Sequence, residues 1–117
     1  MTLQETLTNE IKSAVAARAA GNEGKARVCA RRAVGWAIKE YLREQNETLV
    51  TSSAYEFIKY LRNQPDTRAN MREVLDHFLQ RVEKDAPEED AYFPLEVDLI
   101  DEARWIIAKL LGFELPA

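Results

Sequence analysis

Apolar residues recur along the chain at spacings of three and four, the period of an amphipathic α-helix. The first run covers 3–20 and places on one predicted face Leu3, Leu7, Ile11, Ala14 and Val15. The second run covers 23–45, and its apolar arc consists of Ala26, Ala30, Ala33, Val34, Ala37, Ile38 and Tyr41. Between them lie Gly21 and Asn22, a pair typical of a left-handed helix end. The pattern predicts two long helices joined by a tight turn.

Two shorter helices are predicted in the next stretch of the chain. Ser53 and Glu56 have the spacing of a capping box, and the helix that they begin ends before Pro65. Asp66 or Thr67 is the expected cap of the following helix. The apolar face of that fourth helix consists of Met71, Val74, Leu75, Phe78 and Val82.

A fifth run covers 95–111 and ends at Gly112, while the acidic stretch 85–94 before it, with its two prolines, has the composition of a loop. The fold class is therefore predicted to be all-α, an antiparallel bundle of about five helices in a single domain over 1–117. We expect the second helix at the centre, because its alanines let neighbouring helices approach closely. Gly35, which weakens a helix interior, would be tolerated there for the same close contact.

The composition narrows the classes of protein that remain. An apolar fraction of 46% is enough to bury a core without disulfides, and the single Cys29 cannot form an intrachain bridge. No apolar run is long enough to span a membrane, and the N-terminus lacks a secretory pattern, so we expect a cytoplasmic protein with no membrane partner. A formal net charge of -4 argues against a surface that attracts nucleic acid everywhere.

Charge is distributed unevenly along the chain. The segment 11–43 carries eight basic residues against two acids, and 83–102 carries nine acids against one lysine. The two segments could pair within one bundle or between the subunits of a homodimer. A solvated basic stripe opposite the apolar arc of the second helix consists of Lys25, Arg32, Lys39 and Arg43. Arg27 and Arg31 instead project to the edge of that arc, where their guanidinium groups could contact a ligand beside the helix.

Metal and cofactor chemistry has little support in the sequence. One histidine excludes a His-pair metal site or a Ser-His-Asp triad within one chain, and neither Glu-x-x-His nor a phosphate-binding glycine loop occurs. Asp98, Asp101 and Glu102 could hold a divalent ion, but an acidic face turned to the basic helix is the simpler interpretation. We expect no metal and no cofactor, and we interpret Cys29 as a small hydrophobic residue.

Arg72 and His77 stand near the start of the fourth predicted helix, separated by four residues. The turn at Gly21 and Asn22, with the Ala-rich helix after it, resembles the second helix of HEPN-superfamily bundles. The spacing from Arg72 to His77 is similar to the signature of metal-independent ribonucleases in that superfamily, which usually work as dimers. The resemblance implies that Arg72 stabilises a phosphate and that His77 transfers a proton at the ribose 2′-hydroxyl. Glu73 stands where the family more often has Asn, Asp or His.

The residues themselves leave three functions open. On an ideal helix Arg72 and His77 lie about 140° apart and flank the apolar stripe on opposite sides. Glu73 could therefore simply pair with His77 on the surface. The first hypothesis is a non-enzymatic binding or accessory module that contacts a nucleotide, a nucleic-acid phosphate or a protein partner through Arg27 and Arg31. The second is a HEPN-type endoribonuclease that uses Arg72 and His77, and the third is a structural homodimer. Whether the protein is an enzyme stays open at this point.

Overall fold

The computed structural model describes residues 2–79 and 97–115, and within these ranges the chain forms helices and no strand. The helices are α1 (Leu3–Ala19), α2 (Glu23–Glu44), α3 (Ala54–Arg62), α4 (Ala69–Leu79) and α5 (Leu99–Leu111). The predicted all-α bundle is confirmed. The predicted loop 85–94 and Val82 lie outside the described residues.

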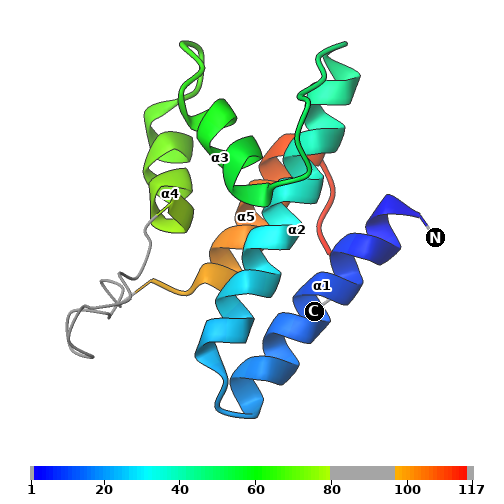
Figure 1. The fold of residues 1–117 in the computed structure, drawn as a ribbon, viewed down its shortest axis with the longest axis vertical. Coiled ribbons are helices and arrows are strands. Elements are labelled where there is room, and N and C mark those ends of the chain that lie inside the picture. The colour runs from blue at the N-terminus through cyan, green and yellow to red at the C-terminus, as the bar shows by residue number, and fades with distance from the viewer. Residues whose placement is uncertain (1, 80–96, 116–117) are drawn as a thin grey trace.

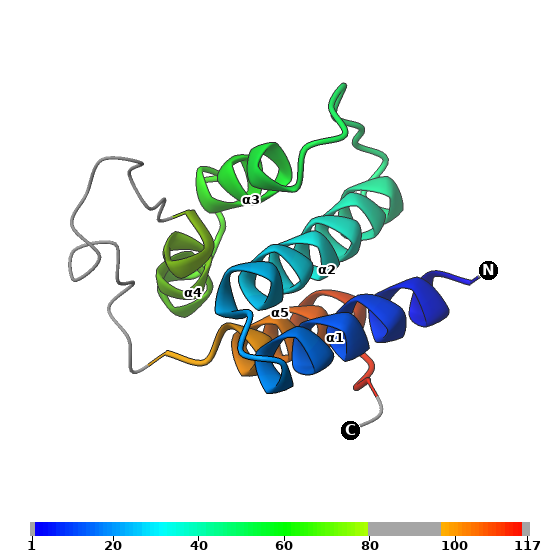
Figure 2. The same cartoon turned by 60° about the horizontal axis from the view of Figure 1, so that its bottom comes forward.

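Helix α2 lies at the centre of the bundle, as its alanines predict. It contacts α1, α3 and α5 (Figure 1). Figure 2 shows α2 between α3 on one side and α1 with α5 on the other. Four alanines of α2 have no exposed surface, namely Ala26, Ala30, Ala33 and Ala37. Small side chains along this face leave room for neighbouring helices to contact α2 closely, which explains how one helix is covered from two sides.

Most helix ends fall where the sequence predicts them. Gly21 and Gly112 both adopt left-handed backbone conformations, with φ of 81° and 76°. The side chain of Asn22 caps α2 by accepting a hydrogen bond from the amide of Lys25 at 3.0 Å. Two tight backbone positions thus end α1 and α5, and they set the directions in which the chain continues.

The caps of the α3–α4 hairpin differ in part from the prediction. Ser53 accepts a hydrogen bond from the amide of Glu56, but its own amide donates to the hydroxyl of Thr51, so only half of the capping box forms. The hydroxyl of Thr67 does not cap α4. It donates to the carbonyl of Leu61 at 2.6 Å and so satisfies the end of α3.

Two further expectations from the sequence were wrong. The last helix begins at Leu99 and not at 95, because Asp98 is its N-cap and accepts hydrogen bonds from two amides of the first turn. Val15 is 46% exposed, and Ala17 is buried in its place. The buried face of α1 therefore continues through the smaller side chain.

Gly35 fixes the position of α3 against α2. A Cβ atom at this position would lie 2.7 Å from the Cβ and 2.9 Å from the Cα of Ala54. Such distances are shorter than van der Waals contact, so only glycine allows the first turn of α3 to approach the α2 backbone this closely. The close contact expected at Gly35 is thus confirmed. Within 2–79 and 97–115, none of the helices is both long and apolar enough to cross a bilayer.

Candidate functional site

Arg72 is used to join α3 to α4. Its Nε donates to the carbonyl oxygen of Arg62 at 3.1 Å, and its Nη2 donates to that of Gln64 at 2.9 Å. These carbonyls lie at the end of α3, where helical backbone groups lack partners within the helix. The guanidinium group expected to stabilise a phosphate is therefore turned toward the backbone of the neighbouring helix.

His77 faces the opposite neighbour, α5. Its Nδ1 lies 2.8 Å from a carboxylate oxygen of Glu102, and both side chains are only about one-fifth exposed, at 22% and 20%. The surface pair with Glu73 was therefore wrong, because the carboxylate partner comes from another helix. Arg72 and His77 point to different helices, as their spacing on α4 requires.

The expected acidic group on α5 does not act as a unit. Asp98 caps the helix and pairs with Arg18 at 2.9 Å, while Glu102 contacts His77. Among the residues described, His, Cys, Asp and Glu side chains form no cluster of three or more that could hold a metal ion. Cys29 is buried, as expected for a small hydrophobic residue.

Arg31 and Arg27 lie one turn apart on α2, and Arg31 forms a hydrogen bond with another helix. The Nε of Arg31 donates to the carbonyl oxygen of Phe78 at 3.2 Å, near the end of α4. Arg27 is half-buried and forms neither a hydrogen bond nor an ion pair with the part of the chain described here. Arg31 thus joins the central helix to α4 one residue beyond His77.

A surface groove of about 460 Å³ runs between α2 and the start of α3. We call it the α2–α3 groove. Its lining consists of Val28, Arg31, Arg32, Gly35, Trp36, Lys39, Ser52, Ser53, Ala54, Tyr55 and Phe57. Arg31 lines this groove, whereas Arg27 does not. The two arginines that were expected to contact one ligand therefore do not share this groove.

The outer wall of the α2–α3 groove combines an exposed aromatic ring with cations. Trp36 is 42% exposed, and the Nζ of Lys39 lies 5.3 Å from its ring centroid, within cation-π range. Arg32, one turn before Trp36, is also exposed. The predicted basic stripe is therefore solvated, and Trp36 lies on the same face of α2, between two of its members. The spacing of four from Arg32 and three to Lys39 places all three on one face.

The inner wall of the groove is the N-terminus of α3. Its cap residue Ser53 and the following Ala54 line the groove. They lie close to α2 because Gly35 has no side chain that would collide with Ala54. Helix N-termini carry a partial positive charge from their unpaired amides. The outer wall of the groove thus carries cations and its inner wall is the positive end of a helix, although the chain as a whole is acidic.

Trp36 also borders a second, smaller hollow of about 250 Å³. Its lining is mainly apolar and includes Leu3, Leu49 and Phe57, with Arg43 at its edge. Arg43 forms an ion pair with Glu40 one turn earlier. The tryptophan ring thus separates a basic groove from an apolar hollow on one face of α2.

A charge cluster at the opposite end of α2 is structural. Arg18 contacts Glu23 at 2.8 Å and Asp98 at 2.9 Å, so the end of α1 is tied to the starts of α2 and α5. Hydrogen bonds that Arg18 donates to the carboxylates of Glu23 and Asp98 raise the pKa of Arg18. Burial raises the pKa of Asp98, but hydrogen bonds from Arg18 and from amides of α5 outweigh it and leave that pKa below its ordinary value. The basic and acidic segments therefore do pair within one chain at this contact.

Comparison of the chain with protein-family models, with curated proteins and with solved structures found no match.

Proposed function

We propose that the protein is a non-enzymatic binding module for single-stranded nucleic acid, which it holds in the α2–α3 groove. The observation that carries this proposal is the exposed Trp36 between Arg32 and Lys39, facing the N-terminus of α3. Arg31 contributes a wall of the groove and joins it to α4. The first hypothesis from the sequence is thus kept, with its cationic contacts moved from Arg27 to Arg32 and Lys39, the two members of the basic stripe that line the groove.

The chemistry of the groove favours an unpaired strand. Proteins that bind single strands combine cations along the backbone with aromatic side chains on which bases stack. Trp36 can accept a base only where the base is not already stacked in a duplex. Phosphates would contact Arg32 and Lys39, and the positive end of α3 adds to the same field. The net charge of -4 means that such attraction must come from local groups of cations and not from the chain as a whole.

Binding is tested by fluorescence anisotropy with a labelled oligouridylate at low salt. For the double variant Arg32→Ala with Lys39→Ala, we expect weaker binding and a salt dependence reduced by about 0.7 in log–log slope for each lost phosphate contact. The matched control is Lys12→Ala with Lys25→Ala, which removes the same charge outside the groove. Equal losses in the two variants, or no binding by the wild type at low salt, would refute the proposal.

Trp36 gives a second readout of the same site. Stacking on an aromatic ring contributes about 1–3 kcal/mol per base, so Trp36→Ala should weaken oligouridylate binding by about fivefold or more. Trp36→Phe should keep part of the affinity, because a ring remains. If a mononucleotide or an acidic peptide binds as tightly as the oligonucleotide, the ligand is one of the other two classes that the sequence left open.

One observation favours the ribonuclease alternative that the HEPN resemblance implies. The carboxylate of Glu102 contacts Nδ1 of His77 and would orient the imidazole, as the partner of a general base does. This alternative predicts that purified protein cleaves single-stranded RNA in EDTA and that His77→Gln abolishes cleavage while circular dichroism stays unchanged. An inactive wild type at high concentration contradicts it. Light scattering at the same concentrations tests the predicted homodimer.

A further inference from the structure

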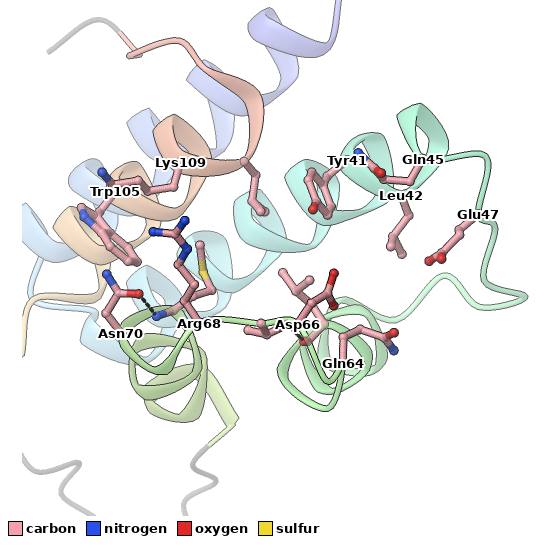
Figure 3. A pocket seen from close by; sticks show the side chains of 14 residues that line it. Tyr41, Leu42, Gln45, Glu47, Gln64, Asp66, Arg68, Asn70, Trp105 and Lys109 are labelled. Atoms are coloured by element: carbon pink, nitrogen blue, oxygen red, sulfur yellow. Dashed lines mark hydrogen bonds between the residues drawn. The ribbon is translucent and has the colours of Figure 1, made fainter.

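A second cleft, distinct from the α2–α3 groove, lies where α2, α5 and the turn between α3 and α4 meet. It encloses about 430 Å³. Figure 3 shows side chains from these elements facing one another across it. Its apolar part consists of Leu42, Leu61, Met71 and Leu110. The functional hypotheses drawn from the sequence do not include any residue of this cleft.

The turn that forms one wall of the cleft is held by hydrogen bonds from side chains to backbone carbonyls. The hydroxyl of Thr67 donates to the carbonyl of Leu61, and Arg72 donates to the carbonyls of Arg62 and Gln64. The side-chain nitrogen of Gln64 also donates to the carbonyl of Tyr60 at 3.2 Å. These contacts fix the turn before any ligand arrives, which lowers the entropy that a ligand would lose on binding.

Two charged side chains of this rigid turn are left uncommitted. Asp66 and Arg68 are exposed and line the cleft, yet neither forms a hydrogen bond or ion pair with any described residue. They lie only two residues apart with opposite charges and still do not pair with each other. Charges presented this way into a cleft are available to a ligand.

The cleft has a cationic end and an acidic end. At one end Arg68 lies beside Trp105 and Lys109 (Figure 3), and the Nζ of Lys109 is 5.9 Å from the ring centroid of Trp105. At the other end lie Asp66 and Glu47. A ligand that satisfies both ends carries an anion and a cation, separated by a body that covers the apolar side chains between them.

We propose that this cleft binds a short zwitterionic peptide of two or three residues with free ends. Its carboxylate contacts Arg68 and Lys109, and its ammonium group contacts Asp66 and Glu47. An aliphatic side chain of the peptide covers the apolar part of the cleft. The side-chain amide of Gln45, the side-chain oxygen of Gln64 and the side-chain nitrogen of Asn70 also line the cleft and can form hydrogen bonds with peptide groups, which a single amino acid would not use.

The test is a titration of ¹⁵N-labelled protein with alanyl-leucyl-alanine, followed by NMR. We expect the indole resonance of Trp105 to shift and that of Trp36 to stay fixed, because the two rings line different hollows. N-acetylation or C-amidation of the peptide should each weaken binding by about fivefold, as expected for loss of one solvent-accessible ion pair. 6-Aminohexanoate, a zwitterion without peptide groups, should bind more weakly than the free tripeptide.

Two variants assign each end of the ligand. Asp66→Asn should weaken binding of the free tripeptide and leave binding of the N-acetylated peptide unchanged. Arg68→Gln should weaken binding of the free tripeptide and leave binding of the C-amidated peptide unchanged. Lys59→Gln and Asp101→Asn, exposed outside the cleft, should change nothing. Neither test residue has a partner in the described fold, so both variants should keep the wild-type melting temperature.

The proposal is overturned if the capped peptides bind as well as the free one, or if the variants affect all peptides equally. It is also overturned if the Trp105 resonance does not respond at millimolar peptide. If 6-aminohexanoate binds with the same affinity as the tripeptide, the cleft recognises only the two charged ends, and the proposal that its ligand is a peptide is refuted.

Discussion

Two parts of the bundle are held together by different kinds of contact. The three-helix core, formed by α1, α2 and α5, relies on close apolar packing over the alanines of α2. The α3–α4 hairpin buries fewer side chains and adds polar bonds between its helices. These include the two bonds of Arg72, the bond of Thr67 to Leu61, and the ion pair of Arg62 with Asp76 at 2.8 Å.

The difference explains why the arginines of this chain have unlike roles. Arg72 and Arg31 donate to backbone carbonyls at the ends of α3 and α4, so they replace apolar contacts that the short helices lack. Arg32 and Arg68 have no such partner within the described fold. The arginines available to ligands are therefore those that the hairpin does not need.

Removing apolar volume from the three-helix core should have the largest effect. Ile107 is fully buried, and Ile107→Ala should lower the free energy of unfolding by about 2–5 kcal/mol through lost burial and a residual cavity. Urea denaturation measures the loss, and hydrogen exchange should accelerate in all described helices together. Faster exchange confined to α5 would mean that the core does not unfold as one unit.

Disturbing the junction between the two parts should cost less. Gly35→Ala places a Cβ 2.7 Å from that of Ala54, and the displacement of α3 should cost about 1–3 kcal/mol. Because alanine has a better helix propensity than glycine, the substitution also stabilises α2 by up to about 1 kcal/mol, which offsets part of this cost. Gly24→Ala is the matched control, because its Cβ meets nothing nearer than 3.8 Å. We expect lower thermal stability for the first variant only, and the opposite order would contradict the close contact.

A change within the hairpin should be smaller and local. Arg72→Ala leaves two carbonyls at the end of α3 without their charged donor, which should cost about 1–2 kcal/mol. Arg72→Lys should not restore the loss, since one ammonium group cannot reproduce the two-armed contact. Hydrogen exchange should accelerate in α3 and α4 before α2. The exposed Arg68→Ala serves as control and should stay within about 0.5 kcal/mol of wild type.

The ion pair between α1 and α5 should contribute least, and only above acidic pH. Because the pKa of Asp98 is lowered in the folded protein, its contribution is present above the ordinary value of 3.8 and is lost as pH falls through the lowered value. Asp98→Asn keeps an oxygen to cap α5 and should cost about 0.5 kcal/mol or less at neutral pH. Thermal melts of both proteins should converge as the pH falls through this lowered pKa. A constant difference at every pH would exclude the charge as its cause.

The sequence predicted the helices and the central position of α2, because hydrophobic periodicity and helix-ending glycines are local signals. It did not predict the partners of its polar residues. His77 and Glu102 are 25 residues apart, and Arg31 and Phe78 are 47 apart. Such contacts depend on how helices pack, which periodicity does not encode. Asp98 was predicted inside a helix because its neighbours are apolar, and its strong preference for the N-cap decided the boundary.

The sequence predicted only part of the α2–α3 groove. The basic stripe and the close contact at Gly35 followed from spacing and residue size. That Ala54 is the residue in contact, and that α3 therefore begins beside Trp36, requires the three-dimensional arrangement. The second cleft had no sequence signal, because its lining comes from three separate segments with no common motif.

The central position of α2 has a consequence for the order in which the chain folds. Helices α1 and α2 adjoin in sequence and can form their hairpin early, whereas α5, which also covers α2, follows some fifty residues later. During synthesis the apolar face of α2 that belongs to α5 stays uncovered until that last helix leaves the ribosome. We therefore expect nascent chains that stop before 97 to be recognised by chaperones that bind exposed apolar surface.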